Sequence, residues 1–472
     1  MVMGELAEGT EVAIIGGGPA GYVCAIRAAQ LGKQVTVIER EGLGGLCLFH
    51  GCIPSKALIH AANQARSISE MSELGISATL NSIDVTKLQA WKTGVITRLN
   101  GGVKTLFSKL GVQTIVGTAS FQGPKRLEII TEKGPGALEF ESCVIATGST
   151  PRSLPGLEFD RKTIISSREA LGLQEIPARL GVVGGGYIGV ELGTAYCKLG
   201  SKVSIIEKGS KILPTVESAA SDLVVARMKE IGIDFWMNSS QENVSVQDGK
   251  VQMTINSIDK GRQQLEFDKL LVAVGHKPNT ELLKLENAGV QLDQYGFIKV
   301  DEKRRTTAPD IYAIGDVAGQ PMLAHKASKE GKVVGEILGG KDVIYDNKAV
   351  PAVIYCDPEI AYVGLQEADA QKQGIEIITG VFNMRGLGKS LTVNRPVGFV
   401  KIIADANTQG TLGAMIVGES ASDLIAEMAL AIEAGLLLED IALTIHSHPT
   451  FSEAIEEAAE AALGKSIHIP KK

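Results

Sequence analysis

One supersecondary unit occurs twice in this chain of 472 residues, and the repeat restricts the possible folds more than any other feature. In each copy, an apolar strand runs into a G-x-G-x-x-G turn, a helical stretch follows, and a second strand ends in a glutamate. The copies span residues 11–41 and 181–208. The glycines of the two turns are Gly16, Gly18 and Gly21 in the first copy and Gly184, Gly186 and Gly189 in the second.

The residue types in each turn have a common physical explanation. The first glycine makes the turn from strand to helix, the second lets the backbone approach a pyrophosphate, and the third lets the helix pack on the strand. The helix N-terminus then directs its N–H groups at the phosphates. Glu39 and Glu207 each lie 23 residues after the first glycine of their turn, close to the offset of about 20 that places a carboxylate on a ribose hydroxyl. The chain is therefore predicted to bind two dinucleotides.

Each copy is followed by an apolar strand that stops at a glycine. These strands are 143–148, ending at Gly148, and 270–275, ending at Gly275. Such an end is typical of a chain that turns over a ligand or leaves a domain, although an ordinary turn has the same pattern. Domain edges near residues 150 and 280 follow. After residue 350, strand-like segments precede helical ones, which predicts an α+β domain without a nucleotide turn.

Two cysteines, Cys47 and Cys52, lie five positions apart in a segment that contains glycine and proline. On an ideal helix their Cα atoms would be about 8.6 Å apart, whereas a disulfide needs less than about 7 Å. The pair can therefore close only on distorted backbone, which Gly51 and Pro54 would provide. A bridge on strained backbone is more reducible than a structural one, and Lys56, one helical turn after Cys52, favours a thiolate. Two ordinary buried thiols are the alternative.

A segment near the C-terminus, 445–453, offers acid–base groups. Its two histidines, His446 and His448, have no second cluster of cysteine, histidine or carboxylate residues with which to hold a metal. We interpret the segment as an acid–base pair in which Glu453 accepts a hydrogen bond from one imidazole, raising its basicity and fixing its tautomer. A solvated turn is the alternative.

The composition excludes several classes of function. Lys plus Arg total 47 against 54 Asp plus Glu, a net charge of -7, so neither nucleic acid nor an anionic membrane is an expected partner. The apolar stretch 428–445 is interrupted by carboxylates, so no membrane span is predicted. Six cysteines are too few for a disulfide scaffold. We expect a cytoplasmic protein, or one from an organelle matrix or stroma after removal of a leader.

Taken together, these motifs resemble those of the pyridine nucleotide–disulfide oxidoreductases, and within them the branch that oxidises dihydrolipoyl groups. The similar motifs run nearly end to end, at 16–21, 47–56, 146–148, 184–191, 313–316, 358–364 and 448–453. The resemblance implies an α/β fold with two Rossmann-like dinucleotide-binding domains and a C-terminal α+β dimerisation domain. The implied parts are an FAD-binding domain at 1–149, an NAD-binding domain at 150–280, a central domain completing the FAD site at 281–349 and an interface domain at 350–472.

The resemblance also implies FAD on the first glycine turn. Glu39 would bind the adenosine ribose and Asp316 the ribityl chain, and a helix starting near His325 would lie beneath the isoalloxazine. Further cofactor contacts are implied for Lys56, Thr147 and Gly148.

The second turn would take NAD(H), with Glu207 on the ribose and a further contact at Gly275. A carboxylate at this position disfavours the 2′-phosphate of NADP, although Lys208 is adjacent. Glu191 is similar to the family glutamate that lies beside the nicotinamide and pairs with the lysine, here Lys56.

The implied reaction is oxidation of dihydrolipoyl groups by NAD+. By resemblance, Cys47 forms the mixed disulfide with substrate, Cys52 passes electrons to the flavin, and His448, held by Glu453, removes the substrate proton. In this family that histidine comes from the other subunit, which implies a homodimer. The implied partners are the lipoyl-bearing subunits of 2-oxo acid dehydrogenase or glycine cleavage complexes.

The chain departs from the family pattern between the cysteines. Leu46 replaces a common threonine, and Phe49 and His50 follow where the usual pattern is Asn-x, which predicts altered loop packing and redox potential. Two alternative functions are a related disulfide reductase of the glutathione-reductase type and a flavin-binding assembly subunit without catalytic activity. The first is expected to show Val-Pro-Lys-Lys after the second cysteine, where this chain has Ile-Pro-Ser-Lys.

Overall fold

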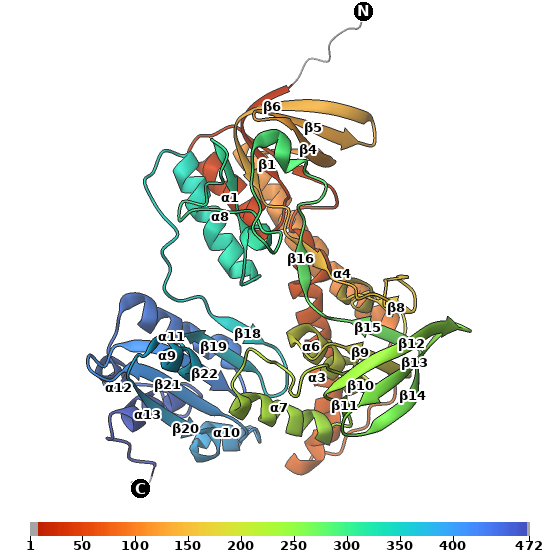
Figure 1. The fold of residues 1–472 in the computed structure, drawn as a ribbon. Coiled ribbons are helices and arrows are strands. Elements are labelled where there is room, and N and C mark those ends of the chain that lie inside the picture. Colours follow the sequence, from red (N-terminus) through yellow and green to blue (C-terminus); the bar gives the residue numbers. More distant parts are fainter. Residues whose placement is uncertain (1–7, 470–472) are drawn as a thin grey trace, which may run out of the picture. The chain divides into compact units, whose positions relative to one another are not determined.

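The computed structural model of this protein describes residues 8–469 (Figure 1). The chain divides into two compact units. Of the described residues, the first unit contains 8–64, 77–175 and 274–346, and the second contains 65–76, 176–273 and 347–469. Within the described range, no helix is long and apolar enough to cross a membrane.

A mixed sheet forms the centre of the first unit. Its strands are β1 (Glu8–Ile15), β2 (Val35–Glu39), β3 (Gln113–Val116), β4 (Thr118–Gly123), β5 (Arg126–Thr131), β6 (Gly134–Ile145) and β17 (Ile311–Ala313). They lie in the order β3-β2-β1-β6-β5-β4, with β17 also beside β6. The pairs among β3, β2, β1, β6 and β17 are parallel, whereas β4, β5 and β6 pair antiparallel. The first glycine copy therefore lies in the parallel part of the sheet, where a strand–helix–strand crossover belongs.

The helices that begin in the first unit are α1 (Pro19–Gln30), α2 (Gly45–His50), α3 (Cys52–Glu70), α4 (Val85–Leu110), α5 (Ser167–Ala170) and α8 (Ala324–Leu338). The shorter elements are the strands β7 (Ser149–Pro151), β8 (Ile164–Ile165) and β16 (His276–Pro278) and the 3-10 helices η2 (Leu285–Ala288) and η3 (Gly315–Ala318). Side chains alternate across β1, so Val12 and Ile14 pack with α1 and α8, and Ala13 and Ile15 pack on the other face.

Helix α8 lies along α1 (Figure 1). A Cβ atom at Gly331 would lie 2.4 Å from the carbonyl oxygen of Ala20, and one at Gly335 would lie 3.0 Å from that of Cys24. The two helices thus approach each other backbone to backbone, which a larger residue at either glycine would prevent. This contact supports the helix that follows the first glycine turn.

A parallel sheet carries the second glycine copy in the second unit. Its strands β9 (Arg179–Val183), β10 (Lys202–Ile206), β11 (Asp234–Trp236) and β15 (Lys269–Val272) lie in the order β11-β10-β9-β15. The accompanying elements are η1 (Met71–Leu74), α6 (Tyr187–Lys198) and α7 (Ser218–Glu230), and an antiparallel sheet of β12 (Ser239–Gln247), β13 (Lys250–Ser257) and β14 (Gly261–Phe267). The predicted duplication is confirmed, because β9, α6 and β10 repeat the plan of β1, α1 and β2.

The C-terminal region is an antiparallel sheet covered by helices, which confirms the predicted α+β pattern. The strands lie in the order β18 (Ala352–Ile354), β19 (Ile360–Gly364), β22 (Thr411–Val417), β21 (Phe399–Asp405), β20 (Ile377–Asn383). The helices are α9 (Glu367–Gln373), η4 (Met384–Gly386), α10 (Gly388–Thr392), α11 (Ala421–Ala434), α12 (Leu438–Ala442) and α13 (Glu453–Ala462). One apolar cluster joins the sheet to α11, α12 and α13.

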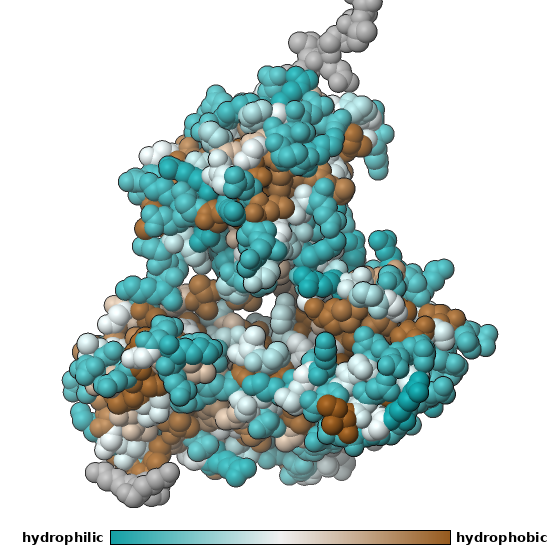
Figure 2. Space-filling model, viewed as in Figure 1, coloured by the Kyte–Doolittle hydropathy of each residue, from teal (hydrophilic) through white to brown (hydrophobic). Residues whose placement is uncertain are grey.

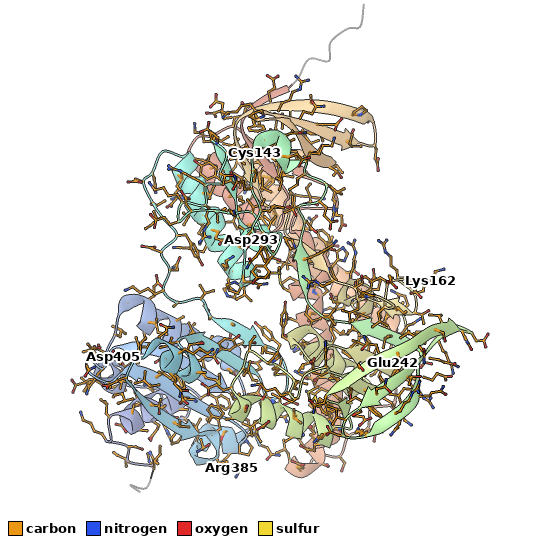
Figure 3. The ribbon with its side chains drawn as sticks, viewed as in Figure 1. Cys143, Lys162, Glu242, Asp293, Arg385 and Asp405 are labelled. Carbon is orange, nitrogen blue, oxygen red and sulfur yellow. A yellow bond between two sulfur atoms is a disulfide. The ribbon has the colours of Figure 1, made fainter. Side chains whose placement is uncertain are left out.

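Four cysteines outside the 47–52 pair are free thiols. Cys24, Cys143 and Cys356 are buried, and Cys197 is half-buried. Cys143 lies on β6 within the first unit (Figure 3). Burial raises the pKa of its thiol, and the same holds for the other three. These thiols are therefore packing residues, as predicted.

Candidate active site

The first glycine turn has the geometry that a pyrophosphate site requires. Gly16 has a φ of +105°, and a Cβ there would lie 2.3 Å from the carbonyl oxygen of Ala146. A Cβ at Gly21 would lie 1.9 Å from the carbonyl oxygen of Gly16, so the helix contacts the turn directly. Gly18 begins α1 without a side-chain cap, and Pro19 follows it. The first N–H groups of α1 are thus left for an anionic ligand.

The second turn repeats this geometry closely. Gly184 has a φ of +109°, and a Cβ at Gly189 would lie 2.1 Å from the carbonyl oxygen of Gly184. Gly186 begins α6 without a side-chain cap, and no atom lies within 4 Å of where its Cβ would be. The space beside this glycine is open, so the backbone can be approached by a phosphate group. Both turns therefore fit a dinucleotide.

The two predicted acidic residues occupy equivalent positions. Glu39 Oε2 accepts a hydrogen bond from the N–H of Gly17, and Glu207 Oε2 accepts one from the N–H of Gly185, each at 2.7 Å. The other oxygen of each carboxylate accepts from the amide two residues further along the chain, at 2.8 Å and 2.6 Å respectively. Each carboxylate is thus held beside its own glycine turn, where the ribose of a dinucleotide on that turn would lie. Contact with the ribose stays a prediction.

Cys47 and Cys52 form a disulfide, with their Cα atoms 4.7 Å apart. The helical path is broken at Gly51, whose φ of -142° and ψ of -109° separate α2 from α3. Pro54 lies in the first turn of α3, where a missing N–H costs nothing. The predicted backbone distortion is confirmed, and the glycine provides it. Lys56 follows Cys52 by one turn of the same helix, as predicted.

The segment that carries the two cysteines, residues 44–56, is anchored on the first glycine turn, and we call it the redox segment. The N–H of Gly44 donates to the carbonyl oxygen of Gly17 at 2.7 Å. A Cβ at Gly45 would lie 2.7 Å from the Cα of Gly18. Helix α2 therefore begins in direct contact with the turn that fits a pyrophosphate, and this contact fixes the disulfide next to the first nucleotide site.

Glu191 is a buried carboxylate on α6, five residues after Gly186. Its Oε1 accepts a hydrogen bond from the N–H of Tyr355 at 2.9 Å. A buried carboxylate needs such a donor because desolvation of its charge is costly. The pairing of Glu191 with Lys56 stays a prediction.

The predicted histidine–glutamate pair is present in the second unit. His448 Nδ1 lies 2.7 Å from Glu453 Oε1, and the N–H of Thr450 donates to Glu453 Oε2 at 2.7 Å. Partial burial works against ionisation of Glu453, but these two hydrogen bonds outweigh it and lower the pKa of that carboxyl. An ionised Glu453 can only accept, so Nδ1 of His448 carries the proton and Nε2 is the basic nitrogen. The His448 side chain is 77% exposed.

The neighbouring histidine has a different environment. His446 Nε2 lies 2.8 Å from Glu427 Oε1, its Nδ1 lies 2.9 Å from the carbonyl oxygen of Thr444, and its side chain is only 5% exposed. The hydrogen bond to Glu427 raises the pKa of His446. This residue thus fastens the segment to α11. Among residues 8–469, no group of three or more histidine, cysteine or acidic side chains is arranged to hold a metal.

A hydrogen-bonded chain at Asp316 was not predicted from the sequence. Ser149 Oγ donates to Asp316 Oδ2 at 2.6 Å and lies 3.1 Å from His276 Nδ1. Ser149 has one hydroxyl proton and donates it to Asp316, so the second hydrogen bond runs from the Nδ1–H group of His276 to the Ser149 oxygen. Burial lowers the pKa of His276, which keeps the ring neutral. No pattern within the sequence connects these three residues, which come from β7, β16 and η3.

The remaining predicted cofactor residues lie in the first unit. Thr147 Oγ1 donates to the carbonyl oxygen of Asn279 at 2.8 Å, and the N–H of Asn279 donates to the carbonyl oxygen of Gly148 at 2.9 Å. Gly275 has a φ of +103°, a conformation that favours glycine. His325 is exposed on the first turn of α8, a helix that begins without a side-chain cap. Their contacts with cofactors stay predictions.

The two dinucleotide turns and the paired cysteines anchored beside one of them define a dinucleotide-dependent disulfide oxidoreductase. Comparison with known families agrees. Residues 10–331 match the family described as pyridine nucleotide-disulphide oxidoreductase, and residues 350–459 match its dimerisation domain. The chain belongs to this family, and the predicted resemblance is confirmed. It is an enzyme that uses FAD and NAD(H), and the two glycine turns fit these cofactors.

Full-length relatives narrow the comparison. Dihydrolipoyl dehydrogenase of Haloferax volcanii is 46% identical over 472 residues, which cover 99% of each chain. The enzyme of the same name from Bacillus subtilis is 42% identical and covers 100% of each chain. Among solved structures, LpdA of Mycobacterium tuberculosis has a TM-score of 0.88 at 28% identity, covering 96% of this chain and 99% of its own. The HOCl-induced flavoprotein disulfide reductase RclA of Escherichia coli has a TM-score of 0.84 at 29% identity, covering 95% and 99%.

Proposed function

We propose that this protein catalyses the reaction for which its full-length relatives are named, the oxidation of dihydrolipoyl groups with NAD+. The observation that carries the proposal is the Cys47–Cys52 disulfide, held between α2 and α3 directly beside the first glycine turn. A structural disulfide would not need a dinucleotide site against its helix. FAD bound beside this turn would supply the two-electron acceptor between the reduced cysteines and NAD+.

The cysteines have different roles in this reaction. His448 Nε2 removes one proton from the substrate dithiol, and the resulting thiolate attacks the sulfur of Cys47. The Cys47–Cys52 bond breaks, a mixed disulfide forms on Cys47, and Cys52 leaves as a thiolate. The second substrate thiol then attacks the substrate sulfur of the mixed disulfide, Cys47 leaves as a thiolate and takes up the proton of that thiol, and the lipoyl disulfide closes with both cysteines reduced. Glu453 holds His448 in the tautomer that this step requires.

The other predicted residues would bind and orient the cofactors. Glu39 and Asp316 hold the ribose and the ribityl chain of FAD, and Ser149 fixes the orientation of Asp316. Glu207 holds the ribose of NAD+. Further contacts that support this arrangement come from the glycine turns, Lys56, Thr147, Gly148, Glu191, Gly275 and His325.

A homodimer completes the site in this proposal, with His448 acting on the cysteines of the partner subunit. The match to a dimerisation domain over residues 350–459 supports it. Figure 2 shows apolar side chains among polar ones on the visible face of the C-terminal region. Near His448, Leu443 is 74% exposed and Ile445 is 95% exposed, so the proposal places these two side chains at the subunit interface.

The proposed partners of this protein are lipoyl-bearing subunits of 2-oxo acid dehydrogenase or glycine cleavage complexes, since these subunits carry the substrate group. We propose functional parts at 1–149 for FAD, 150–280 for NAD, 281–349 to complete the FAD site, and 350–472 for the interface. Free thiols at Cys24, Cys143, Cys197 and Cys356 support a reducing compartment, the cytoplasm or an organelle matrix.

A substrate comparison tests the reaction. The purified flavoprotein should form NADH from dihydrolipoamide and NAD+, and it should have little activity with NADPH and glutathione disulfide. Replacement of NAD+ by NADP+ should lower kcat/KM strongly, because the Glu207 carboxylate repels a 2′-phosphate. Failure to oxidise dihydrolipoamide, together with rapid reduction of glutathione disulfide, would establish the glutathione-reductase alternative.

Hybrid dimers test the shared site. A subunit with Cys52→Ser and one with His448→Gln are each inactive as homodimers in this proposal. Mixing them with exchange of subunits creates one complete site per hybrid, from the thiols of one chain and the histidine of the other. Activity should then return. If the histidine served its own chain, the mixture would stay inactive.

A further inference from the structure

The segment between the two cysteines carries a second set of contacts. The aromatic ring of Phe49 covers Gly42, because a Cβ there would lie 2.8 Å from the ring. His50 Nε2 lies 3.2 Å from Glu41 Oε2. The two residues that depart from the family pattern therefore contact adjacent positions in the loop after β2. The redox segment is held at Phe49 and His50 as well as at Gly45.

Glu41, which contacts His50, is itself held in place by an arginine. Glu41 accepts two hydrogen bonds from the guanidinium of Arg168, from Nη1 to Oε1 and from Nη2 to Oε2, each at 3.0 Å. Bidentate pairs of this kind are strong and directional. Arg168 lies on α5, whose start is capped by Ser166 with Glu169. Glu41 therefore presents a fixed carboxylate to His50.

His50 is the last residue of α2, three positions after Cys47 on the same helix. Residues at this spacing lie on one face, with Cβ atoms about 5–6 Å apart. When the disulfide is open, a thiolate on Cys47 and an imidazolium on His50 are therefore neighbours of opposite charge. Each charged form favours the other, and the two groups titrate as a coupled pair.

We propose that His50, held by Glu41, is a positioning residue that lowers the thiol pKa of Cys47 in the reduced enzyme. This inference rests on the proposed function for the role of Cys47 as the thiol that meets substrate. Deprotonation of the Cys47 thiol is coupled to protonation of the His50 ring, so the proton moves from sulfur to imidazole and the imidazolium stabilises the thiolate. Cys47 is then the better nucleophile for the reverse reaction and the better leaving group for the forward one.

The groups around His50 act on its charge in both directions. In the oxidised protein, burial and the neighbouring Arg168 lower the pKa of His50, while Glu41 and Glu169 act in the opposite direction. Burial opposes ionisation of Glu41, but Arg168 and His50 outweigh it and lower the pKa of that carboxyl. A thiolate on Cys47 would add a further negative neighbour on the same helix, which favours the imidazolium form of His50 in the reduced enzyme.

Alkylation of the reduced enzyme tests the proposal. The holoenzyme is reduced anaerobically with dihydrolipoamide and treated with iodoacetamide over a range of pH, and peptide mass spectrometry measures modification of each cysteine. In His50→Gln, a donor to Glu41 remains but the charge is lost. The apparent pKa of Cys47 should rise by about one unit in this variant. His60→Gln, an exposed histidine on α3, is the control and should match the wild type.

Glu41→Gln provides a second variant that leaves His50 in place. Without the carboxylate, the imidazolium is less stable, so the apparent pKa of Cys47 should shift in the same direction by a smaller amount. Coincident profiles for the wild type and both variants would overturn the proposal. If dihydrolipoamide exposed neither thiol, the proposed function would fail instead, and reduction with a phosphine would still allow the His50 comparison.

Discussion

The two glycine copies have nearly the same local geometry but different surroundings. In both, the first glycine has a positive φ, the third contacts the first, and the glutamate accepts from a turn amide. In the first copy, the Gly45 backbone packs on Gly18, and α8 and α4 pack against α1. In the second, Gly186 faces open space, and Tyr187 beside it is 47% exposed.

This difference indicates how one motif serves two kinds of cofactor. The turn itself provides amide donors and a carboxylate, and these groups determine that a dinucleotide binds. The residues around the turn determine how fast the dinucleotide is released, because an enclosed site must open before its ligand leaves. We therefore expect FAD to remain on the first copy through many turnovers, and NAD(H) to exchange at the second in each.

The largest expected effect comes from a change in the cysteine pair that leaves both glycine turns intact. Cys52→Ser removes the thiol that passes electrons on, so dihydrolipoamide oxidation should fall by at least about a thousandfold. FAD content and NADH binding should stay normal, since neither glycine turn contacts the changed atom. Stopped-flow reduction of the flavin by NADH measures the second point. Loss of flavin from this variant would contradict the separation.

The next effect concerns the enclosure of the first copy. Gly331→Ala places a Cβ 2.4 Å from the carbonyl oxygen of Ala20, so α8 must move away from α1. Overpacking of this kind costs about 1–3 kcal/mol, and retained flavin should fall with it. Thermal unfolding and flavin absorbance after dialysis measure both.

The second copy offers a matched control for that substitution. Gly193 is also a glycine within a buried helix, but its Cβ would meet Ile205 at 3.4 Å, an ordinary contact. Gly193→Ala should be neutral or stabilising, because alanine is favoured over glycine within helices by about 1 kcal/mol. Equal losses of stability in Gly331→Ala and Gly193→Ala would remove the distinction between the copies.

Paired substitutions of the glutamates give a smaller effect. Glu39→Gln and Glu207→Gln each remove the charge and replace one accepting oxygen by an amide NH2 group, so a backbone hydrogen bond of the turn is lost together with the charge-assisted bond to the ribose. Each bond to a charged group is worth about 1.5–3 kcal/mol, or at least about tenfold in affinity. In Glu207→Gln the loss should raise the KM for NAD+ with little change in kcat. In Glu39→Gln it should appear as faster release of FAD at normal KM. An unchanged KM for NAD+ in the first variant would place the NAD+ ribose elsewhere.

A pH dependence of stability is expected within the first unit. Burial on α4 lowers the pKa of Lys92 to about 8, from the usual value near 10.4 in an unfolded chain. Between these values the unfolded state binds more protons than the folded one, so stability should rise as the pH increases through this interval. The gain is about 1.4 kcal/mol for each unit of pKa difference at most. The rise should be absent in Lys92→Met, measured by denaturant unfolding.

Much of this arrangement was predictable because its signals are local. Each dinucleotide motif consists of a strand, a glycine turn, a helix and an acidic residue within some thirty residues. The residues that shape the turn are therefore recognisable from nearby positions in the sequence. The same holds for the cysteine pair and for His448 with Glu453, five residues apart. The helix break was attributed to Gly51 and Pro54 together, and the structure places it at Gly51.

The unpredicted contacts join distant parts of the chain. Ser149, His276 and Asp316 meet because three short elements end at the same place. Arg168 reaches Glu41 across 127 positions of sequence. The sequence offered no periodicity for either contact, since each depends on how strands and loops are arranged after the sheet has formed. Only the fold supplies that information.

The contact between Gly45 and Gly18 has a consequence for protein engineering. Since two backbones touch there, the phosphate turn and the cysteine helix behave as one module, and a designer who transplants the thiol pair into another scaffold must transfer residues 16–56 intact. A side chain introduced at Gly45 would meet the Gly18 backbone at 2.7 Å, separate the turn from the cysteine helix and carry the sulfurs away from their electron acceptor.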